Sequence, residues 1–183
     1  PPRLRCRSAK KSGEVGDGRM IREPKIIDFP ETRLIGARVR TSFVNDRTSE
    51  LWRAFRPVTS TIIGRTGGES YSVKVYDGSY SFSQFDPAAE FDKWAAAAAS
   101  DEAPVPDGME SLIVPAGKYA EFTHVGPSSE APVIFGYIFG EWLPASEFGL
   151  DQRPHFEILP TGYDPFSTDA TERILIPVRS RHA

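Results

Sequence analysis

The chain has 183 residues, of which 39% are hydrophobic and 26% are charged, and its formal net charge is −3. These values indicate a globular domain rather than a disordered chain, and no apolar run is long enough to cross a membrane. The single cysteine, Cys6, excludes a scaffold held by internal disulfides. We expect a cytoplasmic protein, because no apolar stretch follows the basic N-terminus as it would in a signal peptide.

Basic residues concentrate at the N-terminus. Residues 1–19 hold six lysines and arginines against two acidic residues, which leaves the rest of the chain acidic. Because an acidic surface is a poor partner for phosphate backbones, direct binding of nucleic acid is not expected. We predict that residues 1–19 form a disordered tail or an upstream extension and that residues 20–181 form the domain.

The first half of the domain, residues 22–103, begins with two strands and a helix. Alternation and β-branched residues predict strands at 26–29 and 34–40, on either side of a Pro-Glu-Thr turn. Apolar residues three and four positions apart then predict a helix from Thr48 that ends or kinks at Pro57.

The second half, residues 109–179, repeats this order of patterns. A strand with an internal proline is predicted at 112–123, and a helix follows at 133–143. Two further strands are predicted at 155–159 and 172–178.

A duplication is the main architectural signal in the sequence. The prolines inside the first strands, Pro30 and Pro115, lie 85 residues apart, and the heads of the middle strands, Tyr71 and His155, lie 84 apart. We therefore predict an α+β fold of two duplicated β-α-β-β units. Their strands form an antiparallel sheet with two helices on one face and a central ligand groove where the halves meet.

The repeat also decides how the polyalanine segment 95–99 is interpreted. Alanine favours a helix by propensity alone. However, after the alternating strand at 71–76, the segment 90–97 takes the place that 172–178 takes in the second half. We therefore predict a strand there.

Short motifs occur in both halves. Those in the second half are PAGKYA at 115–120, IFGEWLP at 138–144, RPHFE at 153–157 and ERILIPV at 172–178, and those in the first are SELW at 49–52 and FDKWA at 91–95. Together the motifs resemble the GyrI-like domain, which is the effector-binding domain of AraC-type regulators, over residues 22–179. The resemblance implies the duplicated fold and the binding of amphiphilic, often cationic or aromatic, molecules between the two halves. Members of this family include activators fused to helix-turn-helix domains, stand-alone drug-binding proteins, gyrase inhibitors and hydrolases that open cyclopropane rings.

Glu157 is the first candidate for the ligand site. It lies between Phe156 and Ile158 in an apolar strand, where a carboxylate is costly to bury unless it is paired or used. By motif it corresponds to the family's central pocket glutamate, which implies a partner for a bound cation or a general base with a raised pKa. The alternative is a side chain on the solvent face of the sheet. Leu159 stands where the family has a tyrosine.

The other ligand-binding candidates are mostly aromatic. The predicted helix at 133–143 carries more rings than one core stripe needs, so some of them are expected to line the site. The candidates are Trp142, Tyr137 and Phe139 on that helix, His155 on the strand of Glu157, Tyr71, Trp94, Trp52 and Phe55 in the first half, and Glu172. The alternative for the aromatic residues is packing in the core, and the alternative for Glu172 is a salt bridge. His124, His155 and His182 have no spacing that supports a zinc site, and no cofactor is expected.

We predict that the protein binds small amphiphilic or aromatic molecules, cationic ones above all, as an effector sensor or a sequestering protein. One alternative is a hydrolase of strained rings, in which Glu157 would activate water and Trp142 or Tyr137 would position the substrate. A second alternative is a protein partner, as in gyrase inhibition or in pairing with a separate DNA-binding subunit. The monomer and the homodimer both remain open.

Overall fold

The computed structural model describes residues 14–15, 19–20, 23–78, 80, 82 and 84–181. The first half contains β3 (Lys25–Phe29), β4 (Thr32–Thr41), α1 (Thr48–Val58), β5 (Ser70–Val75) and β6 (Phe91–Ala98). The second half contains β7 (Glu110–Val114), β8 (Gly117–Val125), α2 (Ala131–Tyr137), β10 (His155–Leu159) and β11 (Thr171–Ser180). These elements confirm the two predicted β-α-β-β units, and α1 ends one residue after Pro57, as expected.

The second helix continues beyond α2 in an irregular form that the sequence did not predict. A π-helical turn, η3 (Ile138–Trp142), follows α2, and then come the short helix α3 (Leu143–Ala145) and the strand β9 (Phe148–Leu150). Two short 3-10 turns complete the helical elements: η1 (Thr59–Thr61) follows α1 and η2 (Ser128–Glu130) precedes α2.

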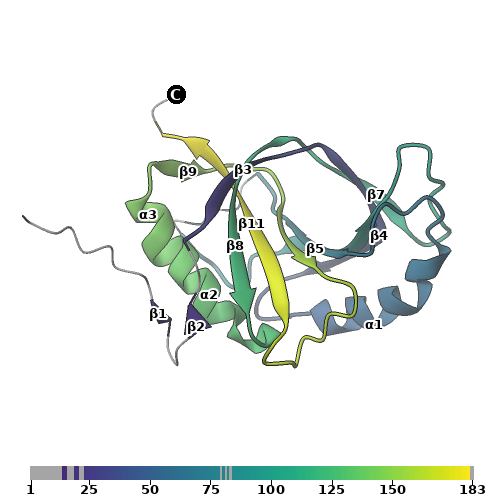
Figure 1. Ribbon diagram of the computed structural model, residues 1–183, viewed down its shortest axis with the longest axis horizontal. Helices are drawn as coiled ribbons and strands as arrows, with labels where there is room; N and C mark the ends of the chain where they lie inside the picture. Colours follow the sequence, from purple (N-terminus) through teal and green to yellow (C-terminus); the bar gives the residue numbers. More distant parts are fainter. Residues whose placement is uncertain are drawn as a thin grey trace, which may run out of the picture.

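The sheet order interlocks the two halves (Figure 1). Neighbouring strands are antiparallel and run in the order β3, β8, β11, β10, β5, β6, β4 and β7, with β9 beside β11. β3 of the first half pairs with β8 of the second half, and β7 of the second half pairs with β4 of the first. Each exchange follows from a break in a long strand, at Pro30 and at Pro115, because proline cannot donate to the ladder of a sheet interior.

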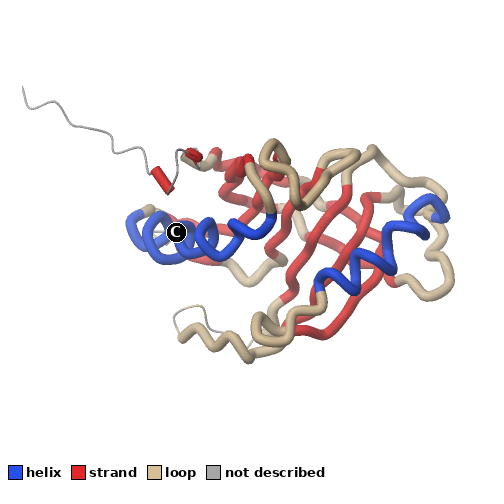
Figure 2. Tube along the Cα trace, turned by 90° about the horizontal axis from the view of Figure 1, so that it is seen from below, coloured by secondary structure: helices blue, strands red, loops and turns tan. Residues whose placement is uncertain are grey.

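Both helices lie on one face of the sheet, and strands are visible between them (Figure 2). α1 packs against β4 and β6, whereas α2 and η3 pack against β8 and β11. The central strands β5 and β10 pair with each other and therefore lie between the two helices. We call the helix-side surface of these two strands, together with the adjoining Lys93 of β6, the seam; it is formed by Ser72, Lys74, Lys93, His155 and Glu157.

The polyalanine segment is a strand because both of its faces are tightly packed. Ala95 and Ala97 lie in the core beneath α1, and Ala96 and Ala98 lie in the core on the opposite face. A β-carbon added to Gly36 of the neighbouring β4 would lie 2.2 Å from the carbonyl oxygen of Ala95. Larger side chains would push the strands and the helix apart, and this packing outweighs the helix propensity of alanine.

The face without helices holds a second core that extends from β3 to β7. Phe29, Tyr119 and Phe156 are at its centre, with ring centroids 5.0 to 5.7 Å apart. The protein therefore has two apolar layers, one on each face of the sheet, and the seam lies on the side that the helices cover.

Helices long and apolar enough to span a membrane are absent from the described part of the chain. The same residues contain no group of three or more His, Cys, Asp or Glu side chains that could hold a metal ion. Near the N-terminus, β1 (Glu14–Val15) pairs with β2 (Arg19–Met20). Most of the predicted tail, including Cys6, and also His182 lie outside the described residues.

Candidate functional site

Strand alternation brings three charged side chains together at the seam. The register pairs His155 with Lys74 and Glu157 with Ser72 across β10 and β5, and it pairs Lys74 with Lys93 across β5 and β6. Paired residues of neighbouring strands point to the same face of a sheet. All five side chains are buried, so Glu157 points inward and is not on the solvent face.

Glu157 is held between two ammonium groups. Lys74 Nζ donates a hydrogen bond to Oε1 of Glu157, and Lys93 Nζ lies 3.5 Å from Oε2. Burial would raise the pKa of Glu157, but Lys74 and Lys93 outweigh it and lower the pKa below its usual range. The raised pKa expected from the sequence is therefore wrong, because the apolar neighbours in the sequence did not reveal the two lysines.

Aromatic rings cover this ion cluster. The Phe135 ring lies with its centroid 4.5 Å from Lys74 Nζ, a cation–π contact. The Phe82 ring, from the connection between β5 and β6, stacks on His155 at 5.0 Å and 13° and on Phe139 at 5.0 Å and 29°. Phe135 and Phe139 on the second helix, Phe82 in the connection and His155 on β10 therefore bring rings from three separate segments to the seam.

His155 is a neutral ring in this stack. It is buried, and Phe139 lies 5.9 Å from it at an angle of 27°. Burial, together with the positive charge of Lys74, lowers the pKa of His155 to about 3, although Glu157 acts in the opposite direction. At neutral pH the imidazole therefore adds an aromatic surface to the site and no charge.

Four predicted site residues lie elsewhere. Tyr71 and Trp94 belong to the core on the opposite face of the sheet, because each stands one residue out of phase with the seam. Trp52 and Phe55 belong to α1 and pack, with their rings edge to face at 5.9 Å, over β4 and β6. The structure therefore places these four candidates away from Glu157, in the core packing that the sequence analysis gave as their alternative.

The helix aromatics divide into two groups. Phe139 faces the seam, whereas Trp142 packs edge to face on Phe122, with centroids 5.0 Å apart, in the core between η3 and β8. Tyr137 also packs against that core. Hydrogen bonds in a π-helical turn join residues five apart, whereas those of an α-helix join residues four apart. The side chain of Trp142, at the end of η3, therefore points in a different direction than it would in a regular α-helix. The structure thus places Trp142 and Tyr137 away from Glu157, contrary to the sequence prediction.

Glu172 takes part in a separate polar group on the same face. Its carboxylate lies 3.1 Å from His124 Nδ1 and accepts a hydrogen bond of 3.0 Å from the Tyr163 hydroxyl, while His124 Nε2 lies 3.1 Å from Glu130. Burial would lower the pKa of His124, but the two carboxylates outweigh it and raise the pKa. This arrangement matches the salt bridge that the sequence left open for Glu172.

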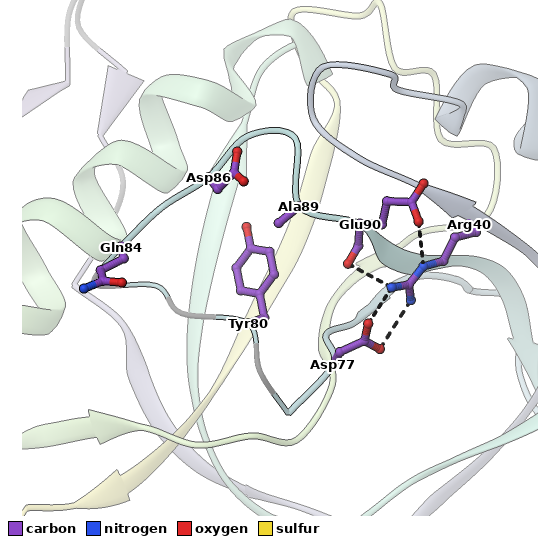
Figure 3. Close-up of a pocket in the computed structure, with 7 residues that line it drawn as sticks. All are labelled: Arg40, Asp77, Tyr80, Gln84, Asp86, Ala89 and Glu90. Carbon is purple, nitrogen blue, oxygen red and sulfur yellow. Dashed lines mark hydrogen bonds and ion pairs between the residues drawn. The ribbon is translucent and has the colours of Figure 1, made fainter.

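A cavity of about 460 Å³ lies at the connection between β5 and β6 (Figure 3). Its lining residues are Arg40, Asp77, Tyr80, Gln84, Asp86, Ala89 and Glu90. Arg40 forms salt bridges with Asp77 and Glu90 at this cavity, as the dashed lines in Figure 3 show. None of the site residues predicted from the sequence lines it.

Residues 22–179 match the model of the GyrI-like small molecule binding domain. The chain belongs to this family. The GyrI-like domain therefore accounts for nearly all of the described chain, over the span that the sequence motifs indicated.

A transcriptional regulator and a solved C-terminal domain are similar to this GyrI-like domain. It is 30% identical to the transcriptional regulator BrlR of Pseudomonas aeruginosa over 129 residues, which are 70% of this chain and 44% of that protein. The chain thus spans less than half the length of that regulator. The crystal structure of the EcmrR C-terminal domain superposes with a TM-score of 0.64 at 16% identity, over 86% of this chain and 98% of that one.

A third relative was solved with a small molecule bound. The structure of SAV2435 bound to tetraphenylphosphonium superposes with a TM-score of 0.58 at 13% identity. The match covers 86% of this chain and 94% of that one. At this level of identity the similarity establishes a shared fold.

Sequence reasoning missed Lys74, Lys93 and Phe82. Lys93 stands between Phe91 and the polyalanine segment, so the rule that identified Glu157, a charge inside an apolar strand, would also have identified this lysine. Lys74 lies in the alternating strand at 71–76 and gave the same signal. Phe82 gave none, because it belongs to a connection without periodicity.

Proposed function

We propose that this GyrI-like domain binds aromatic, amphiphilic small molecules at the seam and serves as an effector-sensing or sequestering module. The observation that supports the proposal best is the cluster of the Phe82, His155 and Phe139 rings, whose centroids lie 5.0 to 5.9 Å from one another, beside the buried ion cluster. A site with flat aromatic walls and a few polar groups at one end is the usual form of a pocket for such ligands.

In this proposal, a ring of the ligand takes the position that Phe82 fills in the structure, in contact with both His155 and Phe139. Each aromatic contact of this kind contributes about 0.5–1.5 kcal/mol. The polar end of the ligand lies over Lys74, Lys93 and Glu157. The cationic ligand expected from the sequence does not fit this arrangement, because two ammonium groups already neutralise the carboxylate.

A fluorescence titration tests the proposal with N-phenyl-1-naphthylamine, a neutral aromatic probe that brightens in apolar surroundings. We expect saturable binding to the wild-type chain and weaker binding to Phe139→Ala, by about three- to tenfold for one lost stacking contact. Phe82→Ala should bind the probe more tightly, because it empties the position of the ligand ring. Phe166→Ala is the matched control, since that phenylalanine is 86% exposed and should leave the affinity unchanged.

Two results would contradict the proposed function. One is a probe that shows no saturable signal with the wild-type chain. The other is equal affinity for the probe in Phe139→Ala, Phe82→Ala and Phe166→Ala, which would place binding outside the seam.

The hydrolase alternative is supported less well by this geometry. A general base must accept a proton from water in the transition state, and a carboxylate whose pKa is lowered by two ammonium groups is a weak base. We expect no turnover of a cyclopropane-containing alkylator above the rate in buffer. The role as a partner of another protein stays a prediction, to be tested by a pull-down.

A further inference from the structure

The seam holds more positive than negative charge. Within residues 23–78 and 84–181, the ion pairs at this position join two lysines, Lys74 and Lys93, to the single carboxylate of Glu157. His155 contributes no charge at neutral pH. The carboxylate of Glu172, on the same face of the sheet, is paired with His124 and Tyr163 instead. Among the described residues, one positive charge at the seam therefore has no negative partner there.

Lys93 is the lysine with the weaker pairing. An ammonium group carries three N–H donors. Among the described residues, the acceptor for these donors is Oε2 of Glu157, and at 3.5 Å it lies at the limit of a hydrogen bond. Lys74 has the closer oxygen and also the ring of Phe135. With its side chain 4% exposed, Lys93 has little access to solvent, so a buried charge here is short of acceptors.

We infer that the aromatic ligand of the seam carries an anionic group, such as a carboxylate or a sulfonate, which binds beside the Lys93 ammonium. This inference rests on the proposed function and adds the charge of the ligand to it. An anion would supply acceptors to the under-coordinated ammonium and cancel the excess charge. A cation would instead meet a surplus of positive charge, and because these side chains are buried, little solvent is present to screen the repulsion.

A pair of probes with the same shape and opposite charge tests the inference. Tetraphenylborate and tetraphenylphosphonium each present four phenyl rings, and each is titrated at pH 7 against the chain loaded with N-phenyl-1-naphthylamine. We expect tetraphenylborate to displace the neutral probe at a concentration at least about tenfold lower, as a charge interaction near a partly buried site implies.

Two lysine variants show whether the preference comes from the seam. Lys93→Met should remove the preference for the anion, with Lys93→Gln as a second variant that keeps a polar side chain. Lys118→Met is the matched control, because it removes the same charge from a side chain that is 45% exposed and pairs with Asp28. The control should keep the preference of the wild-type chain.

The possible failures are distinguishable. Equal or better displacement by tetraphenylphosphonium, or a preference for the anion that survives in both Lys93 variants, would overturn the inference and leave the proposed function intact. If the neutral probe binds but neither ion displaces it, the inference is again overturned. If the neutral probe does not bind the wild-type chain at all, the proposed function fails and the inference fails with it.

Discussion

Replacing His155 by phenylalanine should make the protein less sensitive to acid. The folded chain keeps His155 neutral, since its pKa is lowered from 6.5 to about 3, whereas the unfolded chain takes up a proton below pH 6.5. A base with a lowered folded-state pKa contributes full stability above its unfolded pKa and loses it as the pH falls. At about 1.4 kcal/mol per pH unit, the loss for His155 reaches about 2 kcal/mol at pH 5.

The measurement is urea denaturation of wild type and His155→Phe at pH 7 and at pH 5. Phenylalanine can keep the stack with Phe82 and Phe139, and any change in packing cancels because each protein is compared with itself at two pH values. The free energy of unfolding should drop by about 2 kcal/mol more in the wild type than in the variant. Equal drops in the two proteins would show that the imidazole is protonated or solvated in the folded chain, and the reasoning would be refuted.

Four further variants test stability. Glu157→Gln should lower the free energy of unfolding by about 3–5 kcal/mol, because it leaves buried ammonium groups without a counter-charge. Lys93→Met should unfold at an equal or higher urea concentration than the wild type. The pKa of Lys93 is lowered from 10.5 to about 8, so its buried positive charge costs about 3 kcal/mol at pH 7. A midpoint for Lys93→Met as low as that of Glu157→Gln would contradict the charge count. Gly36→Ala should lower the free energy of unfolding by about 1–3 kcal/mol, because the added β-carbon clashes with β6. The control Gly78→Ala, with open space around its β-carbon, should change it by no more than about 0.5 kcal/mol. Equal melting temperatures of the two variants would refute the packing argument. The pKa of His124 is raised above 6.5, so its pairing stabilises the fold below pH 6.5 and this contribution is lost as the pH rises. Between pH 8 and pH 6, the melting temperature of the wild type should therefore change more favourably than that of His124→Gln.

Local patterns were sufficient to predict most of the fold. Alternation marked the strands, and the repeated order of elements decided that the segment around Ala95 is a strand although its composition favours a helix. The exchange of β3 and β7 could not be predicted in the same way, because it depends on which strands meet after the chain bends at Pro30 and Pro115.

The site was harder to predict from sequence, because its charges come from three strands. Glu157 could be recognised from its own neighbours, but the charge of the seam depends on Lys74 and Lys93, which reach it only through the register of β10, β5 and β6. Trp142 was placed at the site because the predicted helix carries more rings than one core stripe needs, but the π turn lies at this position and Trp142 packs in the core. The side chains of an irregular helix and of an aperiodic connection cannot be oriented from periodicity.

The exchange of β3 and β7 has a consequence for a chain that is cut between the halves. A nick in residues 99–109 would give two fragments. The first fragment carries β3, which pairs with β8 of the second, and the second carries β7, which pairs with β4 of the first. The fragments should therefore reassociate without a covalent link. Because β5 and β10 would then come from different fragments, a compound bound over them would favour reassembly by mass action, and the split protein would report its ligand through complementation.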